Sequence, residues 1–258
     1  MKIEYCVISD VGRRRQNNED NFFINGTFWE HTEENHVEYA GSSETDHFLC
    51  GVFDGMGGEE YGELASLEAA KLLGRYEDAD FQMLCEQYVD EANKDICDMM
   101  EMLQGGRMGS TLAMAYINGE RLNICNVGDS PIYLLHNETL QQISVNHNEA
   151  QSLFDMGIIT KEQMRSCRQK NHLTQHLGIF EDELIIEPYC NGDIALQEND
   201  YIMLCSDGLT DMLEDKEIEN IFKENSSMYP TALNMIEEAL ARGGKDNVTV
   251  LLVHILEF

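Results

Sequence analysis

The chain has 258 residues, 43% of them hydrophobic and 25% charged, which is enough to bury a core in one large domain or two small ones. Its 48 acidic residues outnumber 17 basic ones and give a formal net charge of −31, which argues against binding to nucleic acid or to anionic membrane surfaces. No run approaches the roughly 18 apolar residues of a spanning helix, and no signal-like stretch precedes the first predicted strand. We therefore expect a cytoplasmic protein without membrane insertion.

Eight cysteines are scattered along the chain without a CxxC pair. Several stand inside apolar strand-like runs, where a thiol packs as a small hydrophobic group. In a cytoplasmic protein this pattern predicts that all eight are reduced and structural. None of them begins a C-x5-R sequence, so the chain offers no nucleophile for thiol-based cleavage of phosphate esters.

The first half of the chain combines short apolar runs with two long amphipathic segments. The apolar run before Asp54 predicts a strand that ends at this residue, and the glycines that follow predict a tight turn. Glu59 and Glu60 are expected to open a helix, because acidic residues suit the positive end of the helix dipole. The predicted elements are strands at 2–9, 21–25 and 48–53, a polar hairpin loop at 26–46, and helices at about 59–74 and 81–103.

The second half begins with strands separated by hairpin-length connections, which predict antiparallel pairing. Residues 146–170 are helical in pattern, polar and poor in core signal, so we expect a mobile surface flap. No repeat, Pro-rich linker or low-complexity tract divides the chain, which favours a single domain over residues 1–258. The predicted elements are strands at about 110–117, 121–127, 131–135, 140–145, 183–190, 200–205 and 248–255, and helices at about 208–213, 215–224 and 230–241.

Five aspartates stand beside a glycine, an asparagine or a strand end, far apart in the sequence. They can form a site only if a sheet brings the strand ends together. Oxygen ligands of this kind suit Mg²⁺ or Mn²⁺ rather than zinc, and clustered carboxylates need cations because they repel one another. Two ions that share a carboxylate can activate a bridging water for an in-line displacement. The five residues are Asp20, Asp54, Asp129, Asp207 and Asp246.

Three consecutive arginines precede the first of these aspartates. For Arg13 and Arg14 a solvated loop is the expected environment. A guanidinium near a carboxylate–metal cluster can hold a phosphate with two hydrogen bonds, which makes Arg15 the candidate phosphate-binding residue.

Six segments in order, VGRRRQNNED, FDGMGG, GDS, LTQHLG, SDGLTD and GGKDN, extend this pattern over most of the chain. The series resembles the motifs of the metal-dependent PP2C (PPM) serine/threonine phosphatases, in the form of the compact bacterial single-domain members. The resemblance covers about residues 4–255. It implies an α+β fold with a central antiparallel β-sandwich and helices on both outer faces, a four-layer α-β-β-α arrangement. It also implies hydrolysis of phosphoserine and phosphothreonine in proteins.

The same resemblance implies two tightly bound Mn²⁺ or Mg²⁺ ions and a weaker third. By position in the motifs, Asp54 would bridge two ions, and Gly55 would be a ligand through its carbonyl oxygen. Asp207 and Asp246 would complete the first ion. The flap of the family matches residues 146–170.

Other motif positions imply roles at the edge of this centre. Asp20 would serve the second ion directly or through water, with Glu19 in its outer shell. Asp129, together with Asp207, matches the weaker third site. Arg15 matches the phosphate-binding arginine.

Three positions depart from patterns in the family. Met56 stands where some eukaryotic relatives carry a histidine proposed as general acid. Glu59 stands where many bacterial members have a histidine, and Pro131 replaces an arginine that often follows GDS. The carboxylates are intact, so the open question is the proton donor, for which a metal-bound water is the candidate.

Two alternative functions remain at this stage. One is a catalytically silent relative that binds a phosphoprotein or a regulator, which the loss of a metal carboxylate would favour; none is lost. The other is a phosphatase of small phosphate esters. For the main interpretation we expect a monomer whose substrates are phosphorylated proteins, the targets of a serine/threonine kinase.

Overall fold

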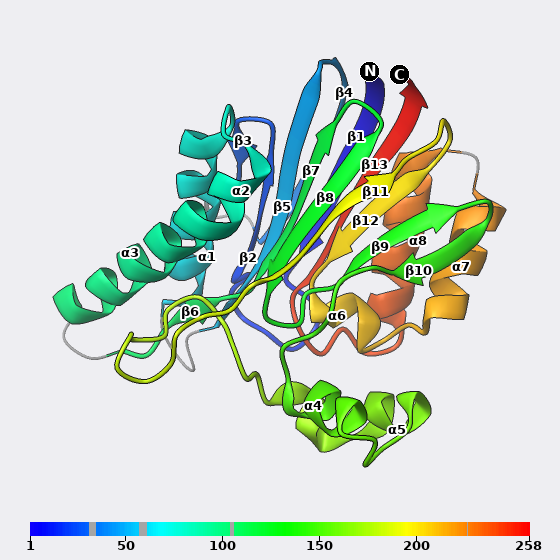
Figure 1. Ribbon diagram of the computed structural model, residues 1–258. Coiled ribbons are helices and arrows are strands. Elements are labelled where there is room, and N and C mark those ends of the chain that lie inside the picture. The colour runs from blue at the N-terminus through cyan, green and yellow to red at the C-terminus, as the bar shows by residue number, and fades with distance from the viewer. Residues whose placement is uncertain (31–34, 57–60, 104–105, 226) are drawn as a thin grey trace.

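Two antiparallel β-sheets stack face to face at the centre of the molecule, and helices cover the outer face of each sheet (Figure 1). This computed structural model describes residues 1–30, 35–56, 61–103, 106–225 and 227–258. The predicted α+β fold, an antiparallel sandwich in a four-layer α-β-β-α arrangement, is confirmed.

The first sheet has six strands in the order β10-β9-β12-β13-β1-β4, and each neighbouring pair is antiparallel. The long strand β1 lies between β13 and β4, and its pairing with β13 brings the two ends of the sequence together in this sheet. The strands are β1 (Lys2–Asp10), β4 (His36–Glu44), β9 (Ile132–His136), β10 (Thr139–Gln142), β12 (Tyr201–Cys205) and β13 (Val248–Glu257).

The second sheet follows the order β11-β8-β7-β5-β2-β3, and the short strand β6 pairs with β5. Its central strand β5 is antiparallel to β2 on one side and to β7 on the other. The strands are β2 (Asp20–Ile24), β3 (Thr27–Phe28), β5 (His47–Met56), β6 (Gly109–Ser110), β7 (Leu112–Asn118), β8 (Arg121–Val127) and β11 (Tyr189–Ala195).

Helices cover the second sheet on one side of the molecule and the first sheet on the other (Figure 1). The predicted flap forms short helices that lie at one end of the sandwich. Over the second sheet lie α1 (Gly62–Leu73), the 3₁₀ turn η1 (Gly74–Tyr76), α2 (Phe81–Met83), the π-helical segment η2 (Leu84–Tyr88) and α3 (Val89–Met102). Over the first sheet lie α6 (Asp207–Thr210), α7 (Asp215–Glu224) and α8 (Met228–Ala241), and the flap contains α4 (Glu149–Asp155), α5 (Lys161–Ser166) and η3 (Arg168–Asn171).

Strand periodicity explains why the molecule has three hydrophobic layers. Successive side chains of a strand point to opposite faces of its sheet. In β5, Val52 belongs to the layer between the two sheets, whereas Phe53 packs under the helices. In β13, Leu251 faces the second sheet and Leu252 faces the helices over the first sheet. Strands buried on both faces therefore read as continuous apolar runs, which made them easy to identify.

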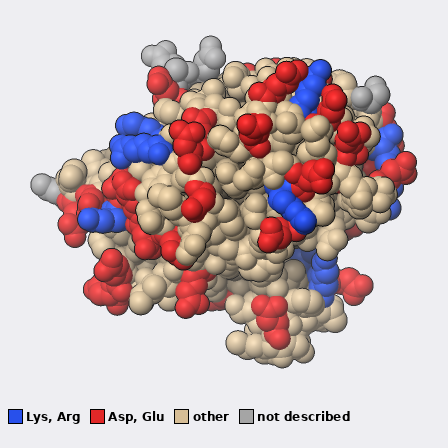
Figure 2. Space-filling view, turned by 45° about the horizontal axis from the view of Figure 1, so that its top comes forward, with Lys and Arg blue, Asp and Glu red and all other residues tan. Residues whose placement is uncertain are grey.

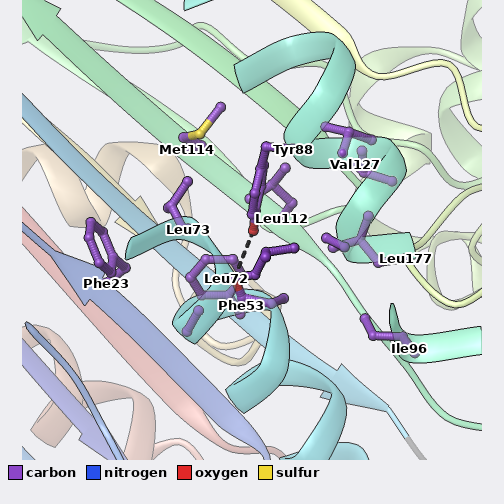
Figure 3. Packing of buried hydrophobic residues seen from close by; sticks show 14 of the residues in the cluster. Phe23, Phe53, Leu72, Leu73, Tyr88, Ile96, Leu112, Met114, Val127 and Leu177 are labelled. Carbon is purple, nitrogen blue, oxygen red and sulfur yellow. Dashed lines mark hydrogen bonds between the residues drawn. The ribbon is translucent and has the colours of Figure 1, made fainter. Parts of the chain in front are cut away.

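The layer under α1 and α3 is built around Tyr88, which is fully buried (Figure 3). Its hydroxyl donates a hydrogen bond of 3.0 Å to the carbonyl oxygen of Ala69 in α1. Leu73 and Ile96 are also fully buried in this layer. This hydrogen bond offsets the cost of removing the hydroxyl from water, and it joins the π-helical segment η2 to α1.

The prediction of a loop over residues 26–46 is wrong for its second half. Strand β4 pairs with β1 along its whole length, from Lys2 opposite Glu44 to Asp10 opposite His36. It is an edge strand, and only one of its faces touches the core, through residues such as Tyr39. A half-solvated edge strand lacks the continuous apolar run by which the buried strands were recognised.

Other boundaries also shift. Strand β5 does not end at Asp54 but continues to Met56, and the strand predicted at 183–190 is found at Tyr189–Ala195, where it is irregular and partly exposed. The predicted helix over 81–103 is continuous, although η2 is π-helical. The predicted turn residues 57–58 and the helix-opening pair Glu59 and Glu60 lie outside the described residues.

The prediction that all eight cysteines are reduced is wrong for two of them. Cys85 in η2 and Cys190 in β11 are joined by a disulfide across 105 positions of sequence. This contact depends on how the helical layer packs on an edge strand, so no local sequence pattern predicts it. The other six cysteines are free, and five of them are buried: Cys6, Cys50, Cys97, Cys125 and Cys205.

Acidic side chains are spread over the surface, as Figure 2 shows for one face. The net charge of −31 is thus largely carried by solvated carboxylates. Within the described part of the chain, every helix is too short or too polar to cross a lipid bilayer.

The buried layer in Figure 3 gives a stability prediction. Leu73→Ala should lower the free energy of unfolding by about 2–5 kcal/mol, because it removes buried methyl groups and leaves a cavity. Tyr88→Phe should cost only about 0.5–1.5 kcal/mol, the net value of one hydrogen bond. Urea denaturation measures both. The control is Met102→Ala at a side chain that is 79% exposed, and an equal loss in this control would contradict the assigned core.

Candidate metal centre

The register of two neighbouring strands places the first two predicted ligands opposite each other. Asp20, the first residue of β2, is the cross-strand partner of Asp54 in β5. Asp20 is fully buried. Two carboxylates directly opposite on adjacent strands repel each other, so this pairing needs compensation from its surroundings.

Two hydroxyl groups, one from strand β13 and one from the residue that follows β12, fix one oxygen of Asp20. Its Oδ2 atom accepts hydrogen bonds from Ser206 Oγ at 2.7 Å and from Thr249 Oγ1 at 2.6 Å. The backbone N–H of Thr249 donates to Ser206 Oγ at 2.9 Å, which leaves the Ser206 proton for Asp20. The other oxygen, Oδ1, is buried without a hydrogen-bond partner. Buried polar atoms without partners are rare, and this one is available as a ligand.

Backbone contacts hold Asp54 and the glycine that follows it. The Asp54 N–H donates to Thr111 Oγ1 at 2.9 Å, and the Thr111 N–H donates to the Asp54 carbonyl oxygen at 2.9 Å. The Gly55 N–H donates to the carbonyl oxygen of Glu19 at 3.1 Å. A Cβ atom on Gly55 would collide with the carbonyl oxygens of Glu19 and Gly62, so only glycine fits here.

The remaining aspartates come from three turns. Asp207 is the first residue of α6, directly after β12, and Asp129 lies in the turn between β8 and β9. A Cβ atom on Gly208 would collide with the carbonyl oxygen of Asn247, so the glycine lets α6 approach the turn that carries Asp246. The sequence therefore brings these carboxylates together through glycines at close backbone contacts.

Asn247 is a positioning residue that the sequence analysis did not single out. Its Oδ1 atom accepts a hydrogen bond from the Glu19 N–H at 2.9 Å. Its Nδ2 atom donates to the carbonyl oxygens of Val11 at 2.9 Å and Asn17 at 3.0 Å. The side chain thus fixes the arginine-containing loop to the turn of Asp246. Its place in the GGKDN segment is the feature of the sequence that could have indicated this role.

Burial and mutual repulsion raise the pKa values of the carboxylates in the centre. Burial raises the pKa of Asp20 to about 7 and that of Asp129 to about 6. The pKa values of Asp54 and Asp207 are raised well above the usual range, first by burial and then by neighbouring carboxylates of this set. Asp246 is one of the neighbours that raise both. Each carboxylate thus lies within the electrostatic reach of others, and a bound cation would relieve the repulsion.

Arg15, the candidate phosphate-binding residue, lies at the rim of the centre, where its guanidinium contacts Asp246. Its Nη2 atom lies 2.7 Å from Asp246 Oδ2, and this hydrogen bond is the main cause that raises the pKa of Arg15. Burial raises the pKa of the adjacent Glu19, and the charge of Arg15 opposes that rise. Arg14 is exposed, and Arg13 is held through its backbone N–H, which donates to Gly244 at 2.8 Å.

A cavity of about 800 Å³ borders the centre on the side of the flap. Asp129 and Asp207 lie in its wall, together with Arg165 and Lys170 of the flap. Lys170 Nζ lies 2.6 Å from Asp211 Oδ1, which links the flap to the residues that follow α6. The cavity therefore joins the carboxylates to a wall that carries both signs of charge.

The residues present fit hard divalent cations, because the donor set consists of carboxylate and carbonyl oxygens and one buried oxygen lacks any partner. Two of the positions that depart from the family pattern lie beside the centre: Met56 ends β5, and Pro131 accepts a hydrogen bond from the Cys205 N–H at 3.2 Å. The third position, Glu59, lies outside the described residues.

Known proteins share both this sequence pattern and this fold. The protein phosphatase 2C family matches residues 6–153. The serine/threonine phosphatase stp of Listeria welshimeri is 34% identical over 254 residues, which are 95% of this chain and 93% of that protein. Protein phosphatase PhpP of Streptococcus pneumoniae is 30% identical over 262 residues, 99% of this chain and 98% of that protein.

Solved structures agree with this similarity. The serine/threonine phosphatase PstP/Ppp of Mycobacterium tuberculosis superimposes with a TM-score of 0.81 at 30% identity, with full coverage of both chains. The catalytic domain of PstP in complex with two manganese ions gives a TM-score of 0.77 at 30% identity, again with full coverage of both chains. The chain therefore belongs to the protein phosphatase 2C (PPM) family of metal-dependent serine/threonine phosphatases.

Proposed function

We propose that this protein removes phosphate from phosphoserine and phosphothreonine of proteins, by attack of a water held at the carboxylate centre with Mn²⁺ or Mg²⁺. The observation that carries the proposal is the Oδ1 atom of Asp20, a buried carboxylate oxygen without a partner that stands opposite Asp54. Family membership and the two manganese ions of PstP support the same conclusion.

The positions of these residues in the family motifs imply a separate role for each ligand. Asp54, at the centre of the set, would bridge two ions, with the Gly55 carbonyl oxygen beside it. Asp207 and Asp246 would hold one ion, and Asp20 the other, with Glu19 close by. Bound ions of this kind supply Lewis acidity and an activated water for an in-line displacement. The hydrogen bonds from Ser206 and Thr249 aim Asp20 by occupying only its Oδ2 atom.

A weaker third ion would bind at Asp129 together with Asp207. The neighbouring carboxylate of Asp211 raises the pKa of Asp129, whereas the positive charge of Lys170 lowers it. A cation at this position would feel the repulsion of Lys170, which gives a physical reason for weaker binding.

Arg15 would bind the substrate phosphate. One of its N–H groups is used by Asp246, which fixes the guanidinium at the rim and leaves further donors for phosphate oxygens. The peptide that carries the phosphate would lie in the cavity between the flap and α7, whose wall includes Lys161, Arg165 and Lys170. Arg165 and Lys170 are paired with Asp215 and Asp211 of the same wall, so they reduce its negative charge where a phosphate would approach.

We also propose the setting in which this activity operates. The substrates would be the products of a serine/threonine kinase, and the enzyme would act in the cytoplasm as a monomer. The chain would form one domain over residues 1–258, with residues 146–170 as a flap over the substrate.

The assignment predicts a metal-dependent activity carried by carboxylates. EDTA should abolish hydrolysis of a phosphothreonine peptide, and Mn²⁺ or Mg²⁺ should restore it. Asp207→Asn should lower kcat by at least about a hundredfold, because transition-state stabilisation by the ions is lost. Asp90→Asn, at an exposed aspartate in the first turn of α3, is the control. Near wild-type turnover by Asp207→Asn would reject the assigned site.

The role of Arg15 predicts an effect on binding. Arg15→Ala should raise KM about 10- to 100-fold with a smaller change in kcat, because a charge-assisted contact made already with bound substrate is lost. Arg14→Ala should change KM little, since its side chain is exposed outside the centre. Steady-state kinetics on one phosphopeptide would decide, and equal effects of both variants would indicate a diffuse electrostatic attraction instead.

The raised pKa of Asp20 predicts how the metal-free protein responds to pH. Its value in the folded state, about 7, lies above the value near 3.9 of an unfolded chain. The folded state therefore binds the proton more tightly, and the free energy of unfolding should fall as pH rises from about 4 to about 7. In wild type this fall in the free energy of unfolding should amount to a few kcal/mol, and in Asp20→Asn it should be absent. Tm measured in EDTA at about pH 5 and about pH 7.5 would show the difference.

Mn²⁺ provides the second half of this test. A ligand at a hundredfold excess over Kd stabilises the folded state by about 2.7 kcal/mol, so wild-type Tm at neutral pH should rise on the order of 5–10 °C. The rise should be much smaller in Asp20→Asn, and NaCl of equal ionic strength should not reproduce it. If Mn²⁺ and NaCl shift both proteins alike, Asp20 is no metal ligand.

A further inference from the structure

A second cluster of metal-ligating side chains lies outside the carboxylate centre. The Sγ atoms of Cys85, Cys125 and Cys190 all lie within 4.8 Å of one another. Among the described residues, this is the one group of three His, Cys, Asp or Glu side chains whose ligand atoms approach so closely. It shares no residue with the phosphatase site and plays no part in the mechanism proposed above.

The three cysteines come from three elements that meet at the edge of the second sheet. Cys85 lies in the π-helical segment η2, Cys125 in β8 and Cys190 in the edge strand β11. Cys125 and Cys190 are direct cross-strand partners, which puts their side chains on the same face of the sheet. Cys125 belongs to the hydrophobic layer under the helices, and Cys85 packs against that layer.

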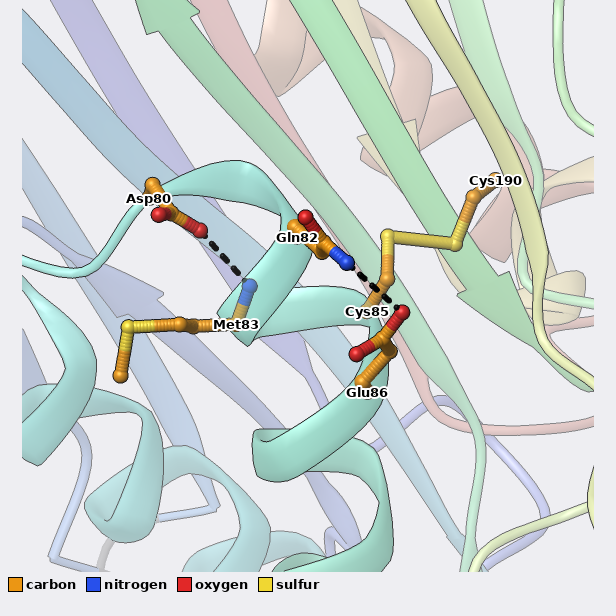
Figure 4. The surroundings of a disulfide bond; sticks show 6 residues. All are labelled: Asp80, Gln82, Met83, Cys85, Glu86 and Cys190. Carbon is orange, nitrogen blue, oxygen red and sulfur yellow. Dashed lines mark hydrogen bonds between the residues drawn. A yellow bond between two sulfur atoms is a disulfide. The ribbon is translucent and has the colours of Figure 1, made fainter.

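The three cysteines differ in their exposure to solvent. Cys125 is fully buried, Cys85 is half-buried and Cys190 is exposed. Cys85 and Cys190 are joined by a disulfide, whose surroundings are shown in Figure 4. The disulfide uses only two of the three sulfur atoms. The position of Cys125 beside them therefore indicates a function that uses all three sulfur atoms.

We propose that, when this disulfide is reduced, the three thiolates bind one soft, thiophilic cation such as Zn²⁺. Thiolate ligands select soft and borderline cations, unlike the all-oxygen centre, which suits Mn²⁺ and Mg²⁺. With metal–sulfur bonds of about 2.3 Å, sulfur ligands of a tetrahedral ion lie about 3.8 Å apart, a spacing that the cluster permits. Water reaches the exposed Cys190 and can fill the fourth position.

Oxidation and cation binding exclude each other at this site. A dithiol reductant supplies two electrons and two protons to the bond between Cys85 and Cys190, which gives two thiols and leaves the reductant as a cyclic disulfide. On binding, each thiol releases its proton to solvent and the sulfur becomes a ligand. The redox state of one pair therefore decides whether the site has one free sulfur atom or three.

The disulfide ties two of these elements together, η2 and β11, whereas a bound cation would tie all three. The chain between η3 of the flap and β11 ends beside Cys190. A cation at the cluster would anchor this connection to the helical layer through Cys85 and to β8, the strand next to the sheet edge, through Cys125. The site is thus placed to hold the end of the segment that leaves the flap.

The test uses the full chain with Mn²⁺ present, so that the carboxylate centre is occupied. Protein reduced with dithiothreitol and freed of it under argon is titrated with Cd²⁺, and the ultraviolet charge-transfer absorbance of Cd²⁺–thiolate bonds is recorded. We expect saturation at one equivalent, displacement by a large excess of Zn²⁺, and no signal from the oxidised protein. Absence of the signal in reduced wild type would overturn the proposal.

Single substitutions then identify the ligands. Cys190→Ser and Cys85→Ser should each weaken Cd²⁺ binding at least about tenfold, and Cys125→Ala should do the same. Cys167→Ser, at a half-buried cysteine outside the cluster, should leave binding unchanged. If Cys125→Ala unfolds, as circular dichroism would reveal, the exposed Cys190→Ser still decides. Full affinity in Cys190→Ser, or loss in Cys167→Ser, would contradict the three-thiolate site.

Discussion

Repulsion among buried carboxylates is the constraint that organises this molecule. Asp20 and Asp54 stand opposite each other on adjacent strands, and burial together with neighbouring charges raises their pKa values. Such an arrangement is stable only where a rigid backbone and fixed hydrogen-bond donors prevent the carboxylates from moving apart. The glycine at position 55 and the hydroxyls of Ser206 and Thr249 supply that rigidity.

The sandwich explains how one end of the fold can hold carboxylates that repel one another. Three hydrophobic layers bury both faces of both sheets, so most of the apolar surface lies away from the charged end. Stability and function are thereby separated in space. The family similarity fits this division, because a solved structure at 30% identity has the same architecture over the whole chain.

Much of this could be predicted from residues alone. Apolar runs revealed β5 and β13, and the aspartates stood out because glycine or asparagine stands next to each of them. Strand β4 was missed because only one face of it touches the core. The Cys85–Cys190 contact and the hydroxyl donors to Asp20 were missed because both join residues that lie more than a hundred positions apart, which no local pattern encodes.

The hydrogen bonds of Asp20 also bear on the order of folding. Asp20 belongs to the second sheet, whereas Thr249 lies in β13 of the first sheet and Ser206 directly follows β12 of that sheet. The centre is therefore completed only when the two halves of the sandwich dock, and a chain with a single formed sheet has no preorganised pair of sites. Divalent ions then act late, by locking an assembled native state instead of nucleating it.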